Sequence, residues 1–137
     1  MNYGVHLTLR IADIERRQAL QSGPAIAAFL SDLVGQIGMR ILAGPLTAEE
    51  TGPPDKRGWS SVVILYESHA AIHTYPELGE VFLDLFSCKP YEVSDVKEMF
   101  QRCFGSYTIK EQEIFDRGIH WGEDIHAEMD SWRALRV

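Results

Sequence analysis

The side chains most able to do chemistry lie between residues 67 and 88. One run reads Glu67-Ser68-His69-Ala70-Ala71-Ile72-His73-Thr74-Tyr75-Pro76-Glu77-Leu78-Gly79, and a second run shortly after it reads Asp84-Leu85-Phe86-Ser87-Cys88. A serine hydroxyl can act as a nucleophile, whereas imidazole, thiol and carboxylate groups transfer protons. The chain contains no glycine-rich phosphate loop, no CxxC pair and no HExxH motif. These two runs therefore hold the candidates for a catalytic site.

His69 and His73 are four residues apart, a spacing that would suit a shared metal ion only on a helix. The neighbouring Ile72, Thr74 and Tyr75 favour a strand instead. We therefore expect catalytic or hydrogen-bonded imidazoles here and no metal site.

The composition is that of an ordinary globular protein and predicts one domain over residues 1–137. Hydrophobic residues make up 45% and charged residues 24% of the chain. Thirteen Lys and Arg against twenty Asp and Glu give a net charge of −7. This balance argues against nucleic acid or an anionic membrane as the partner and favours a small cationic molecule.

The cysteine content and hydropathy bear on location. Cys88 and Cys103 are the only cysteines, no charged-then-apolar leader opens the chain, and no apolar run reaches the roughly 18 residues of a membrane span. We therefore expect a cytoplasmic protein with reduced thiols and no membrane partner.

The first half of the chain is predicted to form strands and a helix of the fold that positions the candidate catalytic residues. Residues 5–11 alternate strictly between apolar and polar, which predicts a half-buried strand. Ser22-Gly23-Pro24 is a helix start and Gly38 a helix stop, and the intervening apolar stripe faces the core. Residues 39–42 then indicate a short strand, and residues 44–58, rich in Gly, Pro and charge, indicate an exposed loop.

The second half continues this pattern. Residues 59–66 and 81–88 indicate strands, and 70–75 could continue as strand after a break. Ser94 is a plausible N-cap for a helix that ends at Gly105, residues 106–115 indicate a last strand, and the polar tail 116–137 is expected to be partly helical or mobile. The order of elements predicts an α+β two-layer sandwich, with a mostly antiparallel sheet and two main helices on one face.

The two runs resemble the core of the small prokaryotic S-adenosylmethionine decarboxylases. The matching residues are Glu67-Ser68-His69, the segment from Ile72 to Glu77 with Gly79, and Asp84, Phe86 and Cys88 at their spacing. Weaker agreement extends from Gly4-Val5-His6-Leu7 to Arg117-Gly118. The resemblance implies a pyruvoyl-dependent decarboxylase of polyamine synthesis that is made as a proenzyme.

The resemblance implies that the proenzyme cuts itself between Glu67 and Ser68, giving fragments 1–67 and 68–137. The Ser68 hydroxyl would attack the Glu67 carbonyl, and elimination and hydrolysis of the ester would leave a pyruvoyl group derived from Ser68. This group would form a Schiff base with the substrate amine and act as the electron sink.

The resemblance also assigns roles to individual side chains. His73 would transfer a proton during processing, with Ser60 as a helper hydroxyl, and Cys88 would reprotonate the α-carbon after decarboxylation. Glu77 matches the acid that holds the ribose hydroxyls. Family members pair two processed protomers, so a homodimer is expected.

Two departures bear on the substrate. Arg10 stands where the family carries an acid in its first strand, and residues 44–58 contain no aromatic residue to stack on adenine. A smaller cationic amino acid, L-ornithine or L-arginine, therefore remains an alternative substrate, with Glu77 and Asp84 as candidates to bind its distal cation. A further alternative is a non-catalytic binding or regulatory homologue in which Ser68 stays uncleaved. The retention of Ser60, Ser68, His73 and Cys88 together argues against that alternative.

Overall fold

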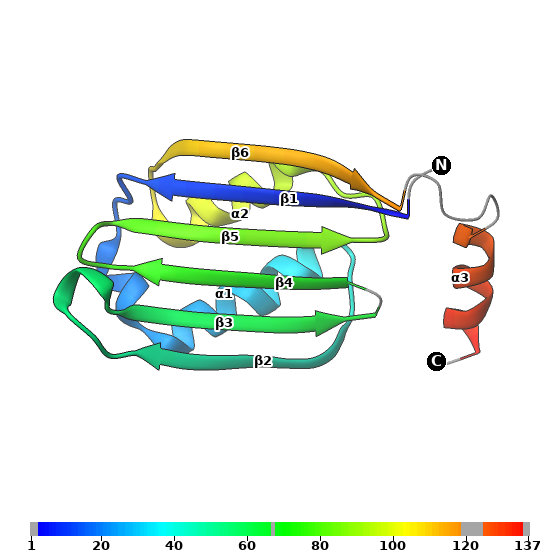
Figure 1. The fold of residues 1–137 in the computed structure, drawn as a ribbon, viewed down its shortest axis with the longest axis horizontal. Helices are drawn as coiled ribbons and strands as arrows, with labels where there is room; N and C mark the ends of the chain where they lie inside the picture. Colours follow the sequence, from blue (N-terminus) through cyan, green and yellow to red (C-terminus); the bar gives the residue numbers. More distant parts are fainter. Residues whose placement is uncertain (1–2, 67, 119–124, 136–137) are drawn as a thin grey trace.

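A six-stranded sheet forms the centre of the molecule, in the order β2-β3-β4-β5-β1-β6 (Figure 1). The computed structural model describes residues 3–66, 68–118 and 125–135. The strands are β1 (Gly4–Ala12), β2 (Ile41–Glu50), β3 (Gly58–Leu65), β4 (Ser68–Tyr75), β5 (Glu80–Ser87) and β6 (Thr108–Arg117). Neighbouring strands pair antiparallel throughout this sheet.

Two helices, α1 (Gly23–Gln36) and α2 (Val93–Phe104), lie on one face of the sheet, behind the strands in Figure 1. Two short 3-10 helices, η1 (Arg17–Gln21) and η2 (Pro54–Lys56), lie in the connections, and α3 (Ile125–Ala134) lies beyond one end of the sheet. The α+β class with two main helices on one face is therefore confirmed.

The core forms where the helix stripes meet the inward residues of the strands. In β1 the alternation places Leu7, Leu9 and Ile11 inward, and each is at most 3% exposed. Phe29 of α1 packs edge-on against Phe100 of α2, with ring centroids 5.6 Å apart. Ser22 caps α1 as predicted, because its hydroxyl accepts a hydrogen bond from the Ala25 N–H. This core fixes the strands that carry the candidate site.

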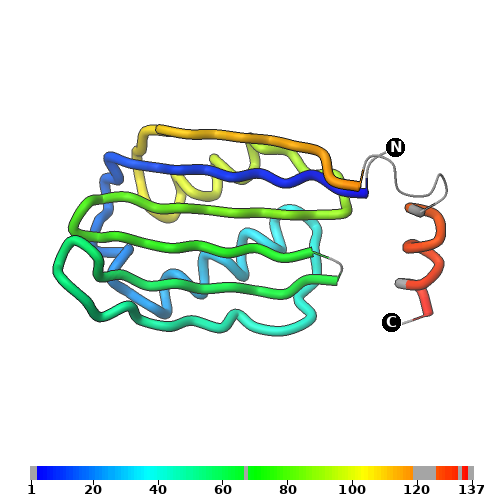
Figure 2. Tube along the Cα trace, viewed as in Figure 1, coloured from blue at the N-terminus to red at the C-terminus, as the bar shows by residue number. Residues whose placement is uncertain are grey.

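The antiparallel pairing gives the sheet two chemically different ends. One end collects the start of β4 at Ser68, the end of β5 at Ser87 and the start of β1, and we call it the Ser68 end. The other end collects the start of β3 and the turn between β4 and β5 that contains Glu77, and we call it the Glu77 end. Figure 2 shows that α3 lies beyond the Ser68 end.

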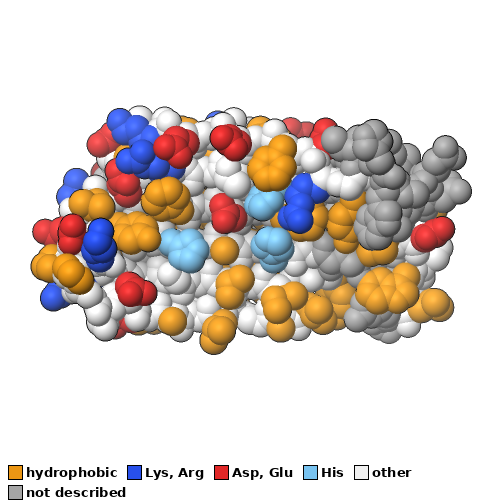
Figure 3. Space-filling view, viewed as in Figure 1, with side chains coloured by type: hydrophobic (Ala, Val, Ile, Leu, Met, Phe, Trp, Pro, Cys, Tyr) orange, Lys and Arg blue, Asp and Glu red, His pale blue; other side chains and the backbone are white. Residues whose placement is uncertain are grey.

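The second face of the sheet, which we call the open face, carries no helix in the described part of the chain. Exposed hydrophobic side chains lie across it, with exposed fractions of 72% for Leu46, 50% for Ile64 and 43% for Phe115. Histidines lie among these hydrophobic side chains at the middle of the face (Figure 3). An apolar surface of this extent is typical of a face that another protein surface covers.

The expected exposed loop over residues 44–58 is wrong over residues 44–50. Residues 41–50 form β2, an edge strand that pairs with β3, and the predicted short strand 39–42 is only its beginning. Nearly all of β2 is solvent-exposed, and its register shifts twice before Leu46. Backbone pairing with β3 along one edge holds this strand, so no pattern of buried residues marks the strand in the sequence. Pro45 is tolerated because β2 is an edge strand.

Several element boundaries also differ from the prediction. The helix expected from Ser94 begins at Val93, with Glu92 at its N-cap, and β5 ends at Ser87 so that Cys88 follows the strand. The last strand spans residues 108–117 instead of 106–115. The tail was expected to be partly helical or mobile, and it carries the helix α3 over Ile125–Ala134, as the helical expectation predicted. Helix and strand ends depend on local capping and pairing, which sequence periodicity locates only to within a few residues.

Candidate active site

Ser68 and Cys88 meet at the Ser68 end of the sheet. Ser68 begins β4, Cys88 follows β5, and both residues are buried, with exposed fractions of 6% and 5%. The Cys88 backbone N–H donates a hydrogen bond to the Ser68 hydroxyl oxygen at 3.1 Å, and that hydroxyl donates to the Cys88 sulfur at 3.6 Å. The thiol itself lies 4.0 Å from the Tyr66 carbonyl oxygen. A nucleophile and a proton-transfer group are thus held in contact.

A hollow of about 410 Å³ opens beside this pair. Its wall includes Cys88, Lys89 and Tyr3, which directly precedes β1 and whose ring lies 5.8 Å from that of Phe86. Two residues of α3, His126 and Asp130, complete the wall. The hollow therefore combines an apolar aromatic side, a thiol and charged groups, which suits a small polar ligand.

Ser60 and His73 form a second pair toward the Glu77 end. They are directly opposite each other on β3 and β4, and Ser60 Oγ lies 2.8 Å from His73 Nδ1. The pair borders a hollow of about 360 Å³. His73 is five residues from Ser68 along one strand, which corresponds to about 17 Å at the rise of a β-strand. Within one chain, then, this pair does not reach the Ser68 hydroxyl.

Glu77 lies farther still from Ser68, in the turn at the Glu77 end. Its backbone carbonyl accepts a hydrogen bond from the Arg17 side chain at 3.3 Å. Its side chain is exposed and borders a hollow of about 280 Å³ that also includes Trp59 and Arg57. The residues predicted to bind and process substrate therefore divide between the two ends of the sheet. Glu67 lies outside the described residues.

Asp84 lies at the middle of the open face, opposite Ala71 and Thr8. Two imidazoles lie toward the Ser68 end of the same face, His6 and His69, with ring centroids 6.0 Å apart. Burial is the main cause that lowers the pKa of each imidazole from its usual 6.5, Arg117 lowers both further, and Asp84 raises both. Among the described residues, His6 Nε2 has no hydrogen-bond partner. The lowered pKa therefore favours the neutral form of both imidazoles near neutral pH.

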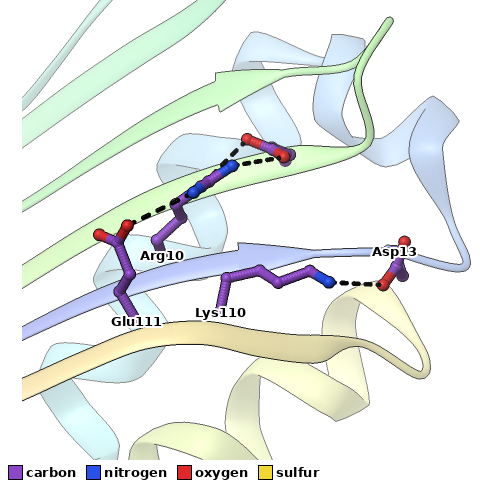
Figure 4. A network of polar contacts seen from close by, with 5 residues as sticks. Arg10, Asp13, Lys110 and Glu111 are labelled. Carbon is purple, nitrogen blue, oxygen red and sulfur yellow. Dashed lines mark hydrogen bonds and ion pairs between the residues drawn. The ribbon is translucent and has the colours of Figure 1, made fainter.

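Arg10, where the family's acid was expected, forms an ion-pair network instead. Its guanidinium bonds both carboxylate oxygens of Glu80, at 3.1 and 3.4 Å, and one oxygen of Glu111 at 3.4 Å. Figure 4 shows this network and, beside it, the Lys110–Asp13 ion pair on neighbouring backbone. The charge change in β1 is thus matched by acids on both flanking strands.

The structure adds residues that sequence reasoning missed. Tyr3 precedes the Gly4-Val5-His6-Leu7 opening, yet nothing in the spacing connects it to Cys88, which is brought beside it by the β1–β5 pairing. His126 and Asp130 lie in the tail, where the sequence offered no motif. In the part of the chain that the structure describes, no cluster of three or more His, Cys, Asp or Glu could hold a metal ion. No helix among those residues is long and apolar enough to cross a bilayer.

The fold and this site define a class: a small two-layer α+β protein with a buried hydroxyl–thiol pair beside a hollow at one end of its sheet. The chain belongs to the S-adenosylmethionine decarboxylase family, whose model matches residues 5–118. The resemblance found in the sequence is therefore confirmed.

Curated relatives and a solved structure agree with this assignment. The S-adenosylmethionine decarboxylase proenzyme of Methanococcus maripaludis is 35% identical over 85 residues, which cover 62% of this chain and 65% of that protein. The Methanococcus vannielii proenzyme is 30% identical over 92 residues, covering 67% and 70%. The crystal structure of the Aquifex aeolicus adenosylmethionine decarboxylase shares the fold with a TM-score of 0.70 at 20% identity, over 86% of this chain and 92% of that one.

Proposed function

We propose that this protein is a self-processing, pyruvoyl-dependent decarboxylase that acts on S-adenosylmethionine in polyamine synthesis. The observation that carries the proposal is the contact between Ser68 and Cys88, two residues far apart in the chain, inside a member of this family. A non-catalytic homologue would have no physical need to bury a hydroxyl against a thiol beside a ligand-sized hollow. The names of the curated relatives support the same substrate.

Processing would begin at Ser68. Its hydroxyl oxygen attacks the Glu67 carbonyl carbon, and the peptide nitrogen leaves, so that an ester replaces the peptide bond. Removal of the Ser68 α-proton then releases the Glu67 carboxylate, and addition of water with loss of ammonia leaves a ketone at residue 68. The products are fragments 1–67 and 68–137.

The surroundings of residue 68 fit such a group. The residue is small and buried, an N–H donor and a thiol lie against its side chain, and a hollow for substrate opens next to it. A pyruvoyl group at this position would supply an electron-withdrawing carbonyl for the decarboxylation. Cys88 would deliver the proton that replaces carbon dioxide on the substrate α-carbon, because its thiol is the proton-transfer group in contact with residue 68.

Pairing of two copies through the open face would complete the site. The face is rich in exposed hydrophobic side chains, which pairing would bury. Ser60, His73 and Glu77 lie toward the end opposite Ser68. A two-fold axis that lies in the interface and runs perpendicular to the strands would bring the Glu77 end of one copy to the Ser68 end of the other. His73 and Ser60 would then act in processing, and Glu77 on the ribose hydroxyls, across the interface of a homodimer.

The missing loop aromatic does not exclude the nucleoside. Tyr3 borders the hollow beside Cys88 and offers an aromatic ring for stacking on adenine. Ornithine and arginine would leave such a ring unused, and they would depend on Glu77 or Asp84 for their distal cation. The cytoplasmic location expected from the cysteines stays a prediction.

Release of carbon dioxide tests the proposal. Purified protein would be incubated separately with carboxyl-labelled S-adenosylmethionine, ornithine and arginine, with the Ser68→Ala variant as control. We expect release from S-adenosylmethionine alone, and none from the control. Turnover of ornithine or arginine without turnover of S-adenosylmethionine would contradict the substrate, and a wild-type chain that stays uncut and inactive would contradict the reaction.

If an amino acid is turned over, competition shows whether a nucleoside pocket exists. Excess S-adenosylmethionine should then strongly inhibit that turnover, whereas a site built for amino acids alone would leave it unchanged.

A further inference from the structure

We propose that Lys89 binds the α-carboxylate of the substrate, so that the hollow at the Ser68 end prefers the substrate over its decarboxylated product. This inference rests on the proposed function and deepens it, because it names the side chain that recognises the group which the reaction removes. Lys89 directly follows Cys88 in the chain and borders the same hollow.

The backbone on both sides of Lys89 is anchored to β5. The Ser87 hydroxyl donates a hydrogen bond to the Lys89 carbonyl oxygen at 2.8 Å, and Ser87 is only 1% exposed. Farther along the chain, the Tyr91 hydroxyl donates to the Leu85 carbonyl oxygen at 3.0 Å. The Lys89 side chain therefore starts from a fixed position next to Cys88.

The Lys89 ammonium offers a positive charge at this hollow. Lys89 is exposed, and no carboxylate among the described residues forms an ion pair with it. His126 and Asp130 border the hollow as well, but each already interacts with another group of the protein. A carboxylate that enters the hollow would therefore gain a charge-assisted hydrogen bond without breaking an ion pair of Lys89.

The substrate must bring an anionic group to this place. The amine of S-adenosylmethionine has to reach residue 68, and the α-carboxylate is bonded to the same carbon as that amine. The carboxylate therefore lies near the contact between Ser68 and Cys88, where the two side chains are 3.6 Å apart. Since the chain carries a net charge of −7, which repels an anion, a local cation favours binding of this group.

The same charge distinguishes the substrate from the product. Carbon dioxide leaves as a neutral molecule, and the product keeps its amine and its sulfonium but has no carboxylate. The Lys89 ammonium attracts the carboxylate of the substrate and has no such group to attract in the product. It repels the positive charges that the product retains, which favours release of the product.

Two nucleosides that cannot react make the test independent of turnover. Deamino-S-adenosylhomocysteine keeps the carboxylate, and its primary amide is a neutral molecule of nearly the same shape. Both lack the amine and the sulfonium. Their affinities for the purified protein would be measured by calorimetry at low ionic strength, and we expect the wild-type protein to bind the acid more tightly.

Three variants separate the position of the charge from the net charge. Lys89→Gln should reduce the preference for the acid by about two- to fivefold, the change expected for loss of one exposed ion pair. Lys89→Arg keeps the charge and should keep the preference. Lys97→Gln removes the same charge from α2, on the face of the sheet that the helices cover, and should leave the preference unchanged.

The outcomes are distinguishable. A wild-type protein that binds both nucleosides equally, a Lys89→Gln protein that keeps the full preference, or a Lys89→Arg protein that loses it would overturn the role of Lys89 and leave the proposed function intact. The same would follow if Lys97→Gln reduced the preference as much as Lys89→Gln, because net charge alone would then attract the acid. A wild-type protein that binds neither nucleoside would instead contradict the proposed substrate, and the role of Lys89 with it.

Discussion

The hydroxyl oxygen of Ser68 lies 3.1 Å from the backbone nitrogen of Cys88, although twenty positions separate the two residues in the chain. The antiparallel pairing of β4 with β5 creates this contact, because the start of one strand lies beside the end of the other. The contact places a proton-transfer group at the residue that we propose to be cleaved. It also makes separate tests of the two side chains possible.

The Cys88→Ala variant should still cut itself but should decarboxylate slowly. A general acid contributes about 10²- to 10⁴-fold to a rate, so we expect kcat to fall by a factor in that range. Intact mass would measure cutting, and carbon dioxide release would measure kcat. Cys103→Ala is the matched control, because that thiol packs at the core on α2 and should not affect kcat. Full activity of a folded Cys88→Ala protein would remove Cys88 from the mechanism.

Ser68→Ala should abolish cutting, because alanine has no nucleophile. Intact mass should show one chain of full length, whereas the wild-type preparation should show fragments 1–67 and 68–137, the second without a free amine at its start. A Ser68→Ala preparation that is cut at the same bond would show that another nucleophile performs the reaction.

Gly58→Ala should weaken the Glu77 end of the sheet. A Cβ at Gly58 would lie 1.6 Å from the Thr74 carbonyl oxygen, so β3 or β4 would have to shift. We expect the free energy of unfolding to fall by about 1–3 kcal/mol, as for other overpacked sites. Gly35→Ala is the control, since its Cβ would meet nothing within 4 Å on an exposed helix position, and it should raise stability by about 0.5–1 kcal/mol. Urea unfolding of both variants would check this, and equal stabilities would contradict the close approach.

The sequence predicts this fold well wherever burial of one face makes hydrophobic residues recur at the period of a strand or a helix. The alternation in β1 and the stripe of α1 predict their inward faces, because Leu7 and Phe29 must leave water. β2 escapes this reasoning, because it is exposed on nearly every residue and is held by edge pairing. Helix α3 escapes it too, since its described side chains are half-buried or exposed.

The candidate site shows a different limit of the sequence. His73 follows Ser68 by five positions, and this closeness suggests one compact site. An extended strand makes the same interval about 17 Å, while pairing brings the distant Cys88 and Tyr3 together. Residue types and spacing therefore identify the participants, and strand geometry decides which of them can meet.

Stability should fall as the pH drops below about 6.5, in part because of His6 and His69. Burial lowers the pKa of each imidazole below 6.5. The unfolded chain then binds protons first as the pH falls, so the folded state loses stability from pH 6.5 down to the lowered folded pKa. Arg117 on β6 adds to this effect, and Asp84 on β5 opposes it.

Urea unfolding from pH 7.5 to 5 at one protein concentration would measure this slope. The His69→Gln variant should have a shallower slope, because glutamine does not titrate. This pH range lies above the pH at which protonation of Glu15 affects stability, because its hydrogen bonds with Ser106 lower the pKa of that carboxyl from 4.5. An identical slope in wild type and variant would show that His69 protonates equally in both states.

The proposed exchange of residues between two copies predicts complementation. A His73→Ala chain has the nucleophile without the imidazole, and a Ser68→Ala chain has the imidazole without the nucleophile. Each alone should stay at full length. In a heterodimer purified through two different tags, the His73→Ala chain should be cut, because the proposed pairing would bring the intact His73 of its partner to its Ser68 end.

The matched control pairs the His73→Ala chain with a partner that carries Ser68→Ala and His73→Ala together. This heterodimer contains no His73, so neither chain should be cut, and intact mass would compare the two preparations directly. Light scattering would establish that both preparations are dimers of the same size. If the His73→Ala chain stays uncut beside an intact His73, or if the wild-type protein is a monomer at micromolar concentration, His73 does not act across an interface. The separation of about 17 Å within one strand would then leave it without a route to Ser68.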